Sequence, residues 1–234
     1  MSCILNIETS TSVCSVALSM DGEVLFAKAS FDGPSHAALL GVFVEEALSV
    51  LKKKGKKALD AVAVSSGPGS YTGLRIGVSV AKGLCFGFGI PLIGIHTLDI
   101  MAATVNSKGD SQIVSMTDNC LYCAMLDARR MEVYAAIYDA SLKPVRETKA
   151  DIVEVGTYAS YLEKGKVCFF GNGASKCKSV ITSPNAIFIE DIHPLAVNMI
   201  PLSEQAFAAG KFEDTAYFEP FYLKEFQATV AKNK

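Results

Sequence analysis

The apolar residues of this 234-residue chain fall into two patterns, short continuous runs and longer stretches with a helical period. Short runs of four to eight apolar residues are typical of buried strands, and apolar residues at every third or fourth position are typical of helices. The first half predicts strands over 4–7, 15–19, 24–29, 59–66 and 91–95, and helices over 35–54, 70–88 and 97–105. Asp21-Gly22 predicts a tight hairpin between the second and third strands.

The second half predicts the same order of elements in outline, with shorter members. Strands are expected over 112–116, 121–127, 132–138, 144–147, 166–170 and 186–189, and helices over 157–164 and 196–209. Pro201 should kink or delay the last helix. The polar break at 106–110 predicts two domains, 1–105 and 106–234, and the segment after Lys224 has no periodic pattern, so we expect a mobile tail.

The stretch around residues 59–98 is unusual because its predicted helix contains four glycines, Gly73, Gly77, Gly83 and Gly87. A glycine inside a helix costs about 1 kcal/mol relative to alanine. Close approach of another backbone would explain them, either within the domain or at a helix–helix interface. The preceding turn, 65–70, matches neither a P-loop nor a dinucleotide-binding spacing, although helix N-terminal N–H groups can hold an anion.

Composition narrows the possible classes of protein. Half of the residues are hydrophobic, one fifth are charged and the net charge is −2, so the chain can bury a large core but lacks the basic balance of a protein that binds RNA alone. Its seven scattered cysteines suit a reducing compartment, and Cys120-x-x-Cys123 is expected to be buried core rather than a metal or redox site. With no leader or membrane span visible in the sequence, we expect a cytoplasmic protein.

One longer string is far more specific than these patterns. Residues 66–77 read SGPGSYTGLRIG, and four further segments accompany them: IETS at 7–10, DARRMEVY at 127–134, GNGA at 171–174 and EPFYLK at 219–224. Together these motifs resemble those of the bacterial TsaB (YeaZ) family. Its members are partner subunits of the machinery that makes threonylcarbamoyladenosine in tRNA.

The resemblance implies an α/β fold with two actin-like domains, as in the actin-like ATPase and sugar-kinase (ASKHA) superfold, whose mixed sheets are flanked by helices. Catalytic relatives hold phosphates with a glycine-containing hairpin after the first strand, whereas residues 8–12 here read ETSTS. The transferase paralogue carries a His-x-x-x-His metal pair. Here His36 matches the first histidine, but Leu40 stands at the position of the second. We therefore expect no catalytic residue and no metal, with His36 a polar residue at a helix start. Gly171-Asn172-Gly173 is expected to be a plain strand–helix turn.

The resemblance also implies the partners. The chain should pair with the TsaD-type transferase, be joined by a TsaE-type ATPase, meet tRNA through the complex and form a homodimer when alone. The complex would transfer a threonylcarbamoyl group to the adenosine next to the anticodon. We expect no cofactor on this chain alone, with ATP or ADP at the complex interface left open. The alternatives are a small ATP-dependent kinase or ATPase of the same superfold, and a homodimeric scaffold.

Two sets of residues follow from the same resemblance. The partner interface is expected on the first long helix and the glycine-containing helix, at His36, Leu39, Leu40, Phe43, Thr72, Gly73, Arg75, Ile76, Gly77 and Val80. A nucleotide or partner cleft is expected at Glu8, Thr9, Ser10, Gly67, Gly69, Asp127, Arg129 and Arg130. For 127–132 a charged hairpin without a binding role is the alternative. The lysines at 52–57 are either a solvated helix end or a contact with RNA phosphates.

Overall fold

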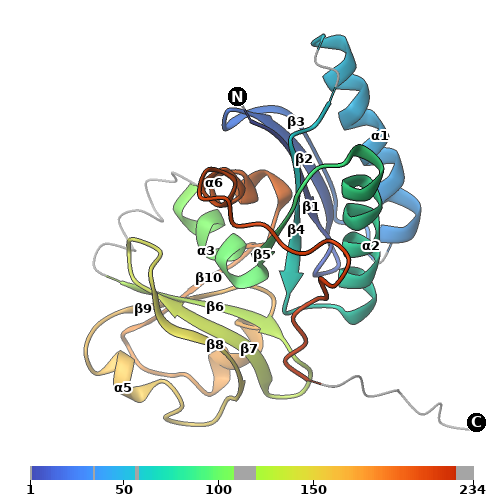
Figure 1. The fold of residues 1–234 in the computed structure, drawn as a ribbon. Helices are drawn as coiled ribbons and strands as arrows, with labels where there is room; N and C mark the ends of the chain where they lie inside the picture. The colour runs from blue at the N-terminus through green and yellow to red at the C-terminus, as the bar shows by residue number, and fades with distance from the viewer. Residues whose placement is uncertain (1, 34, 56–57, 108–119, 225–234) are drawn as a thin grey trace, which may run out of the picture.

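The computed structural model describes residues 2–33, 35–55, 58–107 and 120–224. It contains two five-stranded sheets with helices on their faces (Figure 1). The first half comprises β1 (Cys3–Glu8), β2 (Cys14–Met20), β3 (Glu23–Ser30), α1 (His36–Lys53), β4 (Ala61–Gly67), α2 (Tyr71–Phe88), β5 (Leu92–His96) and α3 (Thr97–Ser107). The second comprises β6 (Leu121–Asp127), β7 (Glu132–Tyr138), β8 (Pro144–Ile152), α5 (Ala159–Leu162), β9 (Val167–Phe170), the 3₁₀ helix η1 (Ser175–Ser179), β10 (Ala186–Ile189) and α6 (Ala196–Ala208).

The two sheets have the same topology. In the first, the strand order is β3-β2-β1-β4-β5, with β1 antiparallel to β2 and parallel to β4. In the second, the order β8-β7-β6-β9-β10 repeats this pattern, with β6 antiparallel to β7 and parallel to β9. The chain therefore folds one arrangement twice, and the actin-like fold expected from the sequence is confirmed.

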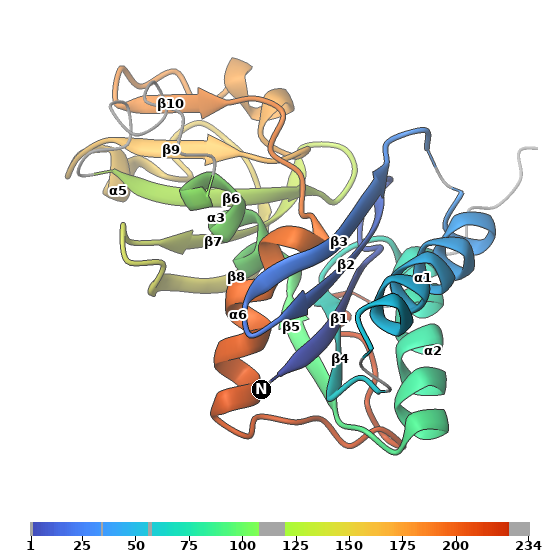
Figure 2. The same cartoon turned by 90° about the horizontal axis from the view of Figure 1, so that it is seen from above.

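Helices separate the sheets and cover their faces. α1 and α2 pack on one face of the first sheet, and α3 and α6 on the other (Figures 1 and 2). Alternation along β1 explains this, because Leu5 and Ile7 face α1 and α2 while Ile4 faces α3 and α6. α3 is buried on two sides: Ile100 packs against the first sheet and Met101 against the second. This double burial joins the two halves.

Most predicted elements are present within a few residues of the expected bounds, and the larger differences lie in the second half. β8 continues to Ile152 instead of ending at residue 147, α5 covers only four residues of the expected 157–164, and η1 was not predicted. α6 begins at the expected residue and contains Pro201. The strand expected over 112–116 and the tail expected after Lys224 lie outside the described residues.

The end of the chain returns to the first sheet. α6 packs on β1 and β2, and the Glu213 N–H donates to the Leu92 carbonyl of β5 at 2.9 Å. We call residues 211–224 the C-terminal strap. The expected second domain, 106–234, thus places α6 and this strap on the first half, which a reading of local periodicity did not reveal.

Candidate functional site

The turn between β4 and α2 is fastened to the hairpin that follows β1. β4 ends at Gly67, whose φ of 107° favours glycine, and the peptide to Pro68 is cis. Ser70 caps α2, its Oγ accepting from the Gly73 N–H at 3.2 Å. The Ser70 N–H in turn donates to the Ser10 carbonyl at 2.6 Å. The motif turn therefore lies directly against the β1–β2 hairpin.

Three glycines present bare backbone to that hairpin. A Cβ on Gly69 would collide with the Ser10 carbonyl oxygen. A Cβ on Gly73 would collide with the Thr9 carbonyl oxygen, and one on Gly77 with the Thr9 hydroxyl. That hydroxyl also donates to the Gly73 carbonyl at 2.8 Å. Of the two explanations for these glycines, the structure shows close packing within the chain, and the assignment of Gly73 and Gly77 to a partner surface stays a prediction.

Glu8 ends β1 and is fully buried. Burial raises the pKa of its carboxyl from 4.5 to about 7, although hydrogen bonds from Ser10 and Ser65 act in the opposite direction. Its Oε1 accepts from the Ser10 N–H at 2.5 Å, and the Thr9 N–H donates to the Ser65 hydroxyl at 3.4 Å. A phosphate-binding hairpin must offer such N–H groups to its ligand. Here both N–H groups are already bonded inside the chain.

His36 fastens the other side of the same hairpin. Its Nε2–H donates to the Thr11 carbonyl at 2.7 Å, and the residue is buried, with an exposed fraction of 6%. Leu40 and Phe43 lie deeper in the core between α1 and the first sheet. These three residues are buried in the isolated chain and support its fold, and their assignment to a partner surface stays a prediction. Within the described residues, no group of three or more His, Cys, Asp or Glu side chains could hold a metal ion.

The C-terminal strap crosses the motif turn. The Phe221 N–H donates to the Ser66 carbonyl at 2.7 Å, and the strap backbone passes so close to Gly67 that a Cβ there would lie 2.8 Å from the Phe221 carbonyl oxygen. The Tyr222 hydroxyl accepts from Arg75 Nε at 3.2 Å. Two of the sequence motifs, 66–77 and 219–224, are thus in direct contact. Sequence periodicity missed this contact because the strap is neither helix nor strand; the signal in the sequence was the motif at 219–224.

The second hairpin, between β6 and β7, is built differently. Asp127 ends β6, and its side chain is 47% exposed and forms an ion pair with Lys176 of η1. Arg129 and Arg130 occupy the turn, exposed and with positive φ. Asn172 supports the hairpin by accepting from the Asp127 N–H at 2.9 Å. Among described residues, no hydrogen bond or ion pair joins this hairpin to the one after β1, so the expected cleft residues form two separate groups.

Comparison with known proteins gives these motifs a context. The model of the TsaD family, tRNA N6-adenosine threonylcarbamoyltransferase, matches residues 32–232. The tRNA threonylcarbamoyladenosine biosynthesis protein TsaB of Escherichia coli is 31% identical over 94% of either chain. The chain belongs to the TsaB (YeaZ) family.

Solved structures agree with this family. YeaZ from Pseudomonas aeruginosa is 26% identical and superposes with a TM-score of 0.73, covering 95% of this chain and all of that one. A protein described as similar to peptidase YEAZ from Pseudomonas aeruginosa superposes with a TM-score of 0.80 at 26% identity, covering 96% of this chain and all of that one. The resemblance inferred from the sequence motifs is therefore confirmed over nearly the whole chain.

Within this TsaB-family fold, the outer surface of α2 is where the predicted interface residues remain accessible. Thr72 and Arg75 are exposed and Ile76 and Val80 are half-buried, as is Leu39 of α1. We call these five residues the α1–α2 face. Further along α2, a Cβ added at Gly83 or Gly87 would meet nothing within 4 Å, and Phe86 is 89% exposed. The glycines at the start of α2 therefore allow close packing on the first hairpin, whereas Gly83 and Gly87 face open space.

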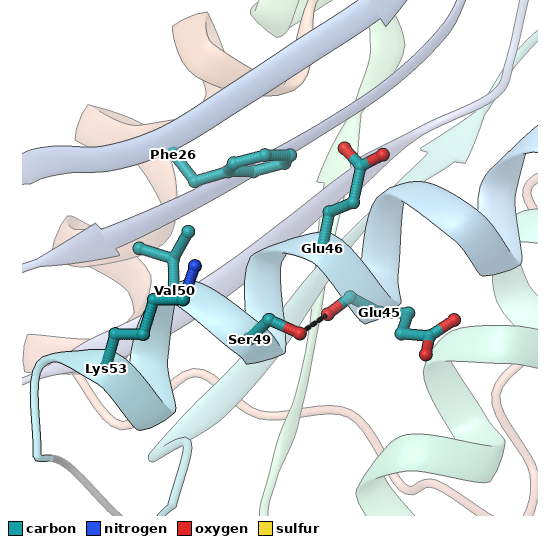
Figure 3. A pocket seen from close by; sticks show the side chains of 6 residues that line it. All are labelled: Phe26, Glu45, Glu46, Ser49, Val50 and Lys53. Atoms are coloured by element: carbon teal, nitrogen blue, oxygen red, sulfur yellow. Dashed lines mark hydrogen bonds between the residues drawn. The ribbon is translucent and has the colours of Figure 1, made fainter.

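Two hollows lie outside the motif turn. A cavity of about 580 Å³ between the halves is lined by residues including His96 and Phe221, and by Asp99, whose carboxylate accepts from the Tyr138 hydroxyl at 2.6 Å. A shallower groove between β3 and α1 is lined by Phe26, Glu45, Glu46, Ser49, Val50 and Lys53 (Figure 3). In Figure 3 the two carboxylates point to different sides, so their charges do not converge. No helix in the described part of the chain is both long and apolar enough to cross a membrane.

Proposed function

We propose that the chain is a non-catalytic partner subunit in tRNA threonylcarbamoyladenosine synthesis, and that it acts by pairing with a TsaD-type transferase. The observation that carries this proposal is that N–H groups of the hairpin after β1 form hydrogen bonds within the chain. The Ser10 and Thr9 N–H groups bond to Glu8 and Ser65, and the bare face of α2 packs against the hairpin. A hairpin closed in this way supplies structure to the chain and offers no cradle for a phosphate.

The rival function, a small ATP-dependent kinase or ATPase, needs this hairpin to be open. A nucleotide phosphate approaches backbone N–H groups closely, which glycine permits and the sequence ETSTS does not. The family comparison also favours tRNA modification over a kinase. We therefore propose that the chain binds no nucleotide by itself, and that any ATP or ADP lies at the complex interface.

The α1–α2 face is the surface proposed for pairing. It combines half-buried aliphatic residues, Leu39, Ile76 and Val80, with the exposed Thr72, a mixture that suits an interface with an apolar centre. The same face would serve a homodimer when the chain is alone and the transferase when it is present. A TsaE-type ATPase would join this pair, and tRNA would bind to the complex. This function implies that the chain acts in the cytoplasm.

The test compares charged substitutions on and off this face. Ile76→Glu places a charge at the proposed contact and should weaken pairing with the transferase by about 10- to 100-fold, equivalent to about 1.4–2.7 kcal/mol. Thr72→Arg tests the same face at an exposed position that cannot disturb the core. Val155→Glu, at a residue 88% exposed in the second half, is the matched control and should pair normally.

Pairing is measured by analytical ultracentrifugation, and circular dichroism checks each fold. The proposal fails if Ile76→Glu and Thr72→Arg are folded and pair as tightly as Val155→Glu.

A further inference from the structure

The β6–β7 turn holds two arginines in a backbone conformation that suits other residues better. Arg129 has φ 73° and Arg130 has φ 49°, and both side chains are exposed. Glycine adopts positive φ freely and asparagine does so at low cost, whereas a long side chain is strained there. Such strain at an exposed position leads to a hypothesis of function.

The acidic residues of this hairpin do not neutralise those arginines. Asp127 forms its ion pair with Lys176, and Glu132 forms its own with Lys224 of the C-terminal strap at 2.5 Å. Lys176 also donates to the Glu132 carbonyl at 2.6 Å. The carboxylates of Asp127 and Glu132 are therefore paired with lysines of η1 and of the C-terminal strap.

The guanidinium groups of Arg129 and Arg130 are left without an ion pair or hydrogen bond to any residue that the structure describes. Guanidinium forks are well suited to phosphate because they can donate two parallel hydrogen bonds to its oxygens. Tyr134, on the strand β7 that follows the turn, has a half-buried ring that packs against the core around Met101. Burial raises the pKa of its hydroxyl, and the charge of Arg129 acts on it in the opposite direction. A partly exposed ring next to cations offers a surface on which a base can stack.

We propose that this hairpin binds the ribose–phosphate backbone of RNA, with Arg129 and Arg130 contacting phosphates. This inference rests on the proposed function, which brings tRNA to the complex. RNA fits better than an acidic protein surface because the adjoining strand carries a half-buried aromatic ring, Tyr134, which the charge of Arg129 reaches. The net charge of −2 gives the chain no general attraction for RNA, so the contact must be local and should contribute mainly within the complex.

The test titrates labelled, unmodified tRNA into the complex of the chain with the transferase, and into the chain alone, at several salt concentrations, with fluorescence anisotropy as the readout. The double variant Arg129→Gln/Arg130→Gln should bind tRNA about 10-fold more weakly and lower the salt slope by about one to two. Arg129→Lys/Arg130→Lys keeps the charge but loses the forks, and should fall between this variant and the wild type.

A matched control removes the same charge elsewhere. Lys143 and Lys164 are both exposed. Lys143 follows the end of β7 and Lys164 precedes the start of β9, so both lie at the opposite end of the second sheet from the β6–β7 turn. Lys143→Gln/Lys164→Gln should leave tRNA affinity unchanged. Arg129→Asn/Arg130→Gly should weaken tRNA binding while keeping or raising Tm, which separates lost contacts from a collapsed hairpin.

Two results would overturn the proposal. One is equal tRNA affinity for the Arg129→Gln/Arg130→Gln variant and the lysine control. The other is unchanged tRNA binding with weakened binding of the ATPase subunit, which would make an acidic protein surface the occupant. Failure of the proposed function shows separately, as a wild-type chain that does not pair with the transferase; in that case the titration of the chain alone decides the RNA contact.

Discussion

The two hairpins at equivalent places in the duplicated fold have opposite characters. Each follows the first strand of its sheet, and each of those strands ends in an acid, Glu8 in β1 and Asp127 in β6. Glu8 is fully buried and forms no ion pair with any residue in the described part of the chain, whereas Asp127 is half-exposed and paired with Lys176. One topology thus produces a sealed structural hairpin in the first half and an exposed, charged one in the second.

The glycine turns beside the hairpins extend this comparison. Gly67 and Gly171 end or follow equivalent strands with similar φ values of 107° and 98°. Two residues later, Gly69 packs on Ser10 and Gly173 on the end of β6. The turns therefore serve the same purpose, close approach to a hairpin. What differs is the helix that follows, because α2 brings Gly73 and Gly77 onto the first hairpin while η1 brings Lys176 to the second.

The largest expected effect separates the two kinds of glycine in α2. Gly73→Leu would push a side chain into the Thr9 carbonyl, and overpacking against backbone should lower the free energy of unfolding by about 3 kcal/mol. Gly83→Leu enters open space and should stabilise the helix by about 0.5–1 kcal/mol. Urea denaturation of both variants measures the difference. Equal stability would mean that the first hairpin is not sealed by α2.

The buried carboxyl predicts a pH dependence. Because the pKa of Glu8 is raised to about 7, the folded chain keeps this proton between pH 4.5 and 7 while the unfolded chain loses it. Stability contributed by Glu8 therefore falls as pH rises through this window, by up to about 3 kcal/mol. Glu8→Gln removes the effect, so its Tm advantage over the wild type should grow from pH 5 to pH 8.

An exposed carboxyl provides the control for that experiment. Glu45→Gln, on the outer side of α1, should differ from the wild type by the same small amount at both pH values. A Glu8→Gln difference that does not change with pH would show that this carboxyl is not held neutral.

Sequence reasoning identified the elements of both halves but not the contacts that give the hairpins their characters. Apolar runs fix strands such as β1 and β6 because burial of alternate side chains needs only local sequence. The partner of Gly73 was not predictable, since Thr9 lies 64 residues away and the helix alone allows either internal packing or an interface. The strap was missed for the same reason: Phe221 meets Ser66 through one backbone hydrogen bond, without a periodic pattern.

The open hairpin should respond to substitution with a gain in stability. Arg129→Asn/Arg130→Gly removes two positive-φ arginines and should raise the free energy of unfolding by about 1 kcal/mol. Urea denaturation measures this change. A loss of more than about 1 kcal/mol would mean that the arginine side chains support the fold.

The smallest effect concerns the ion pair between the strap and the second hairpin. Lys224 and Glu132 are 2.5 Å apart, with side-chain exposures of 47% and 17%. Partly exposed pairs contribute little, so Lys224→Ala should change stability by about 0.5 kcal/mol or less. Calorimetry provides the measurement, and a much larger loss would mean that this pair holds the two halves together.

The most direct test of the account asks whether the chain acts by surface or by chemistry. Threonylcarbamoyladenosine formation on tRNA is measured with the transferase and the ATPase in the presence of wild-type chain, Glu8→Gln or Ile76→Glu. A chain that acts by its surface should give full activity as Glu8→Gln. As Ile76→Glu it should give low activity that recovers when the chain is added in excess, as mass action requires for weakened pairing. Loss of activity with a folded, normally pairing Glu8→Gln chain would contradict the account.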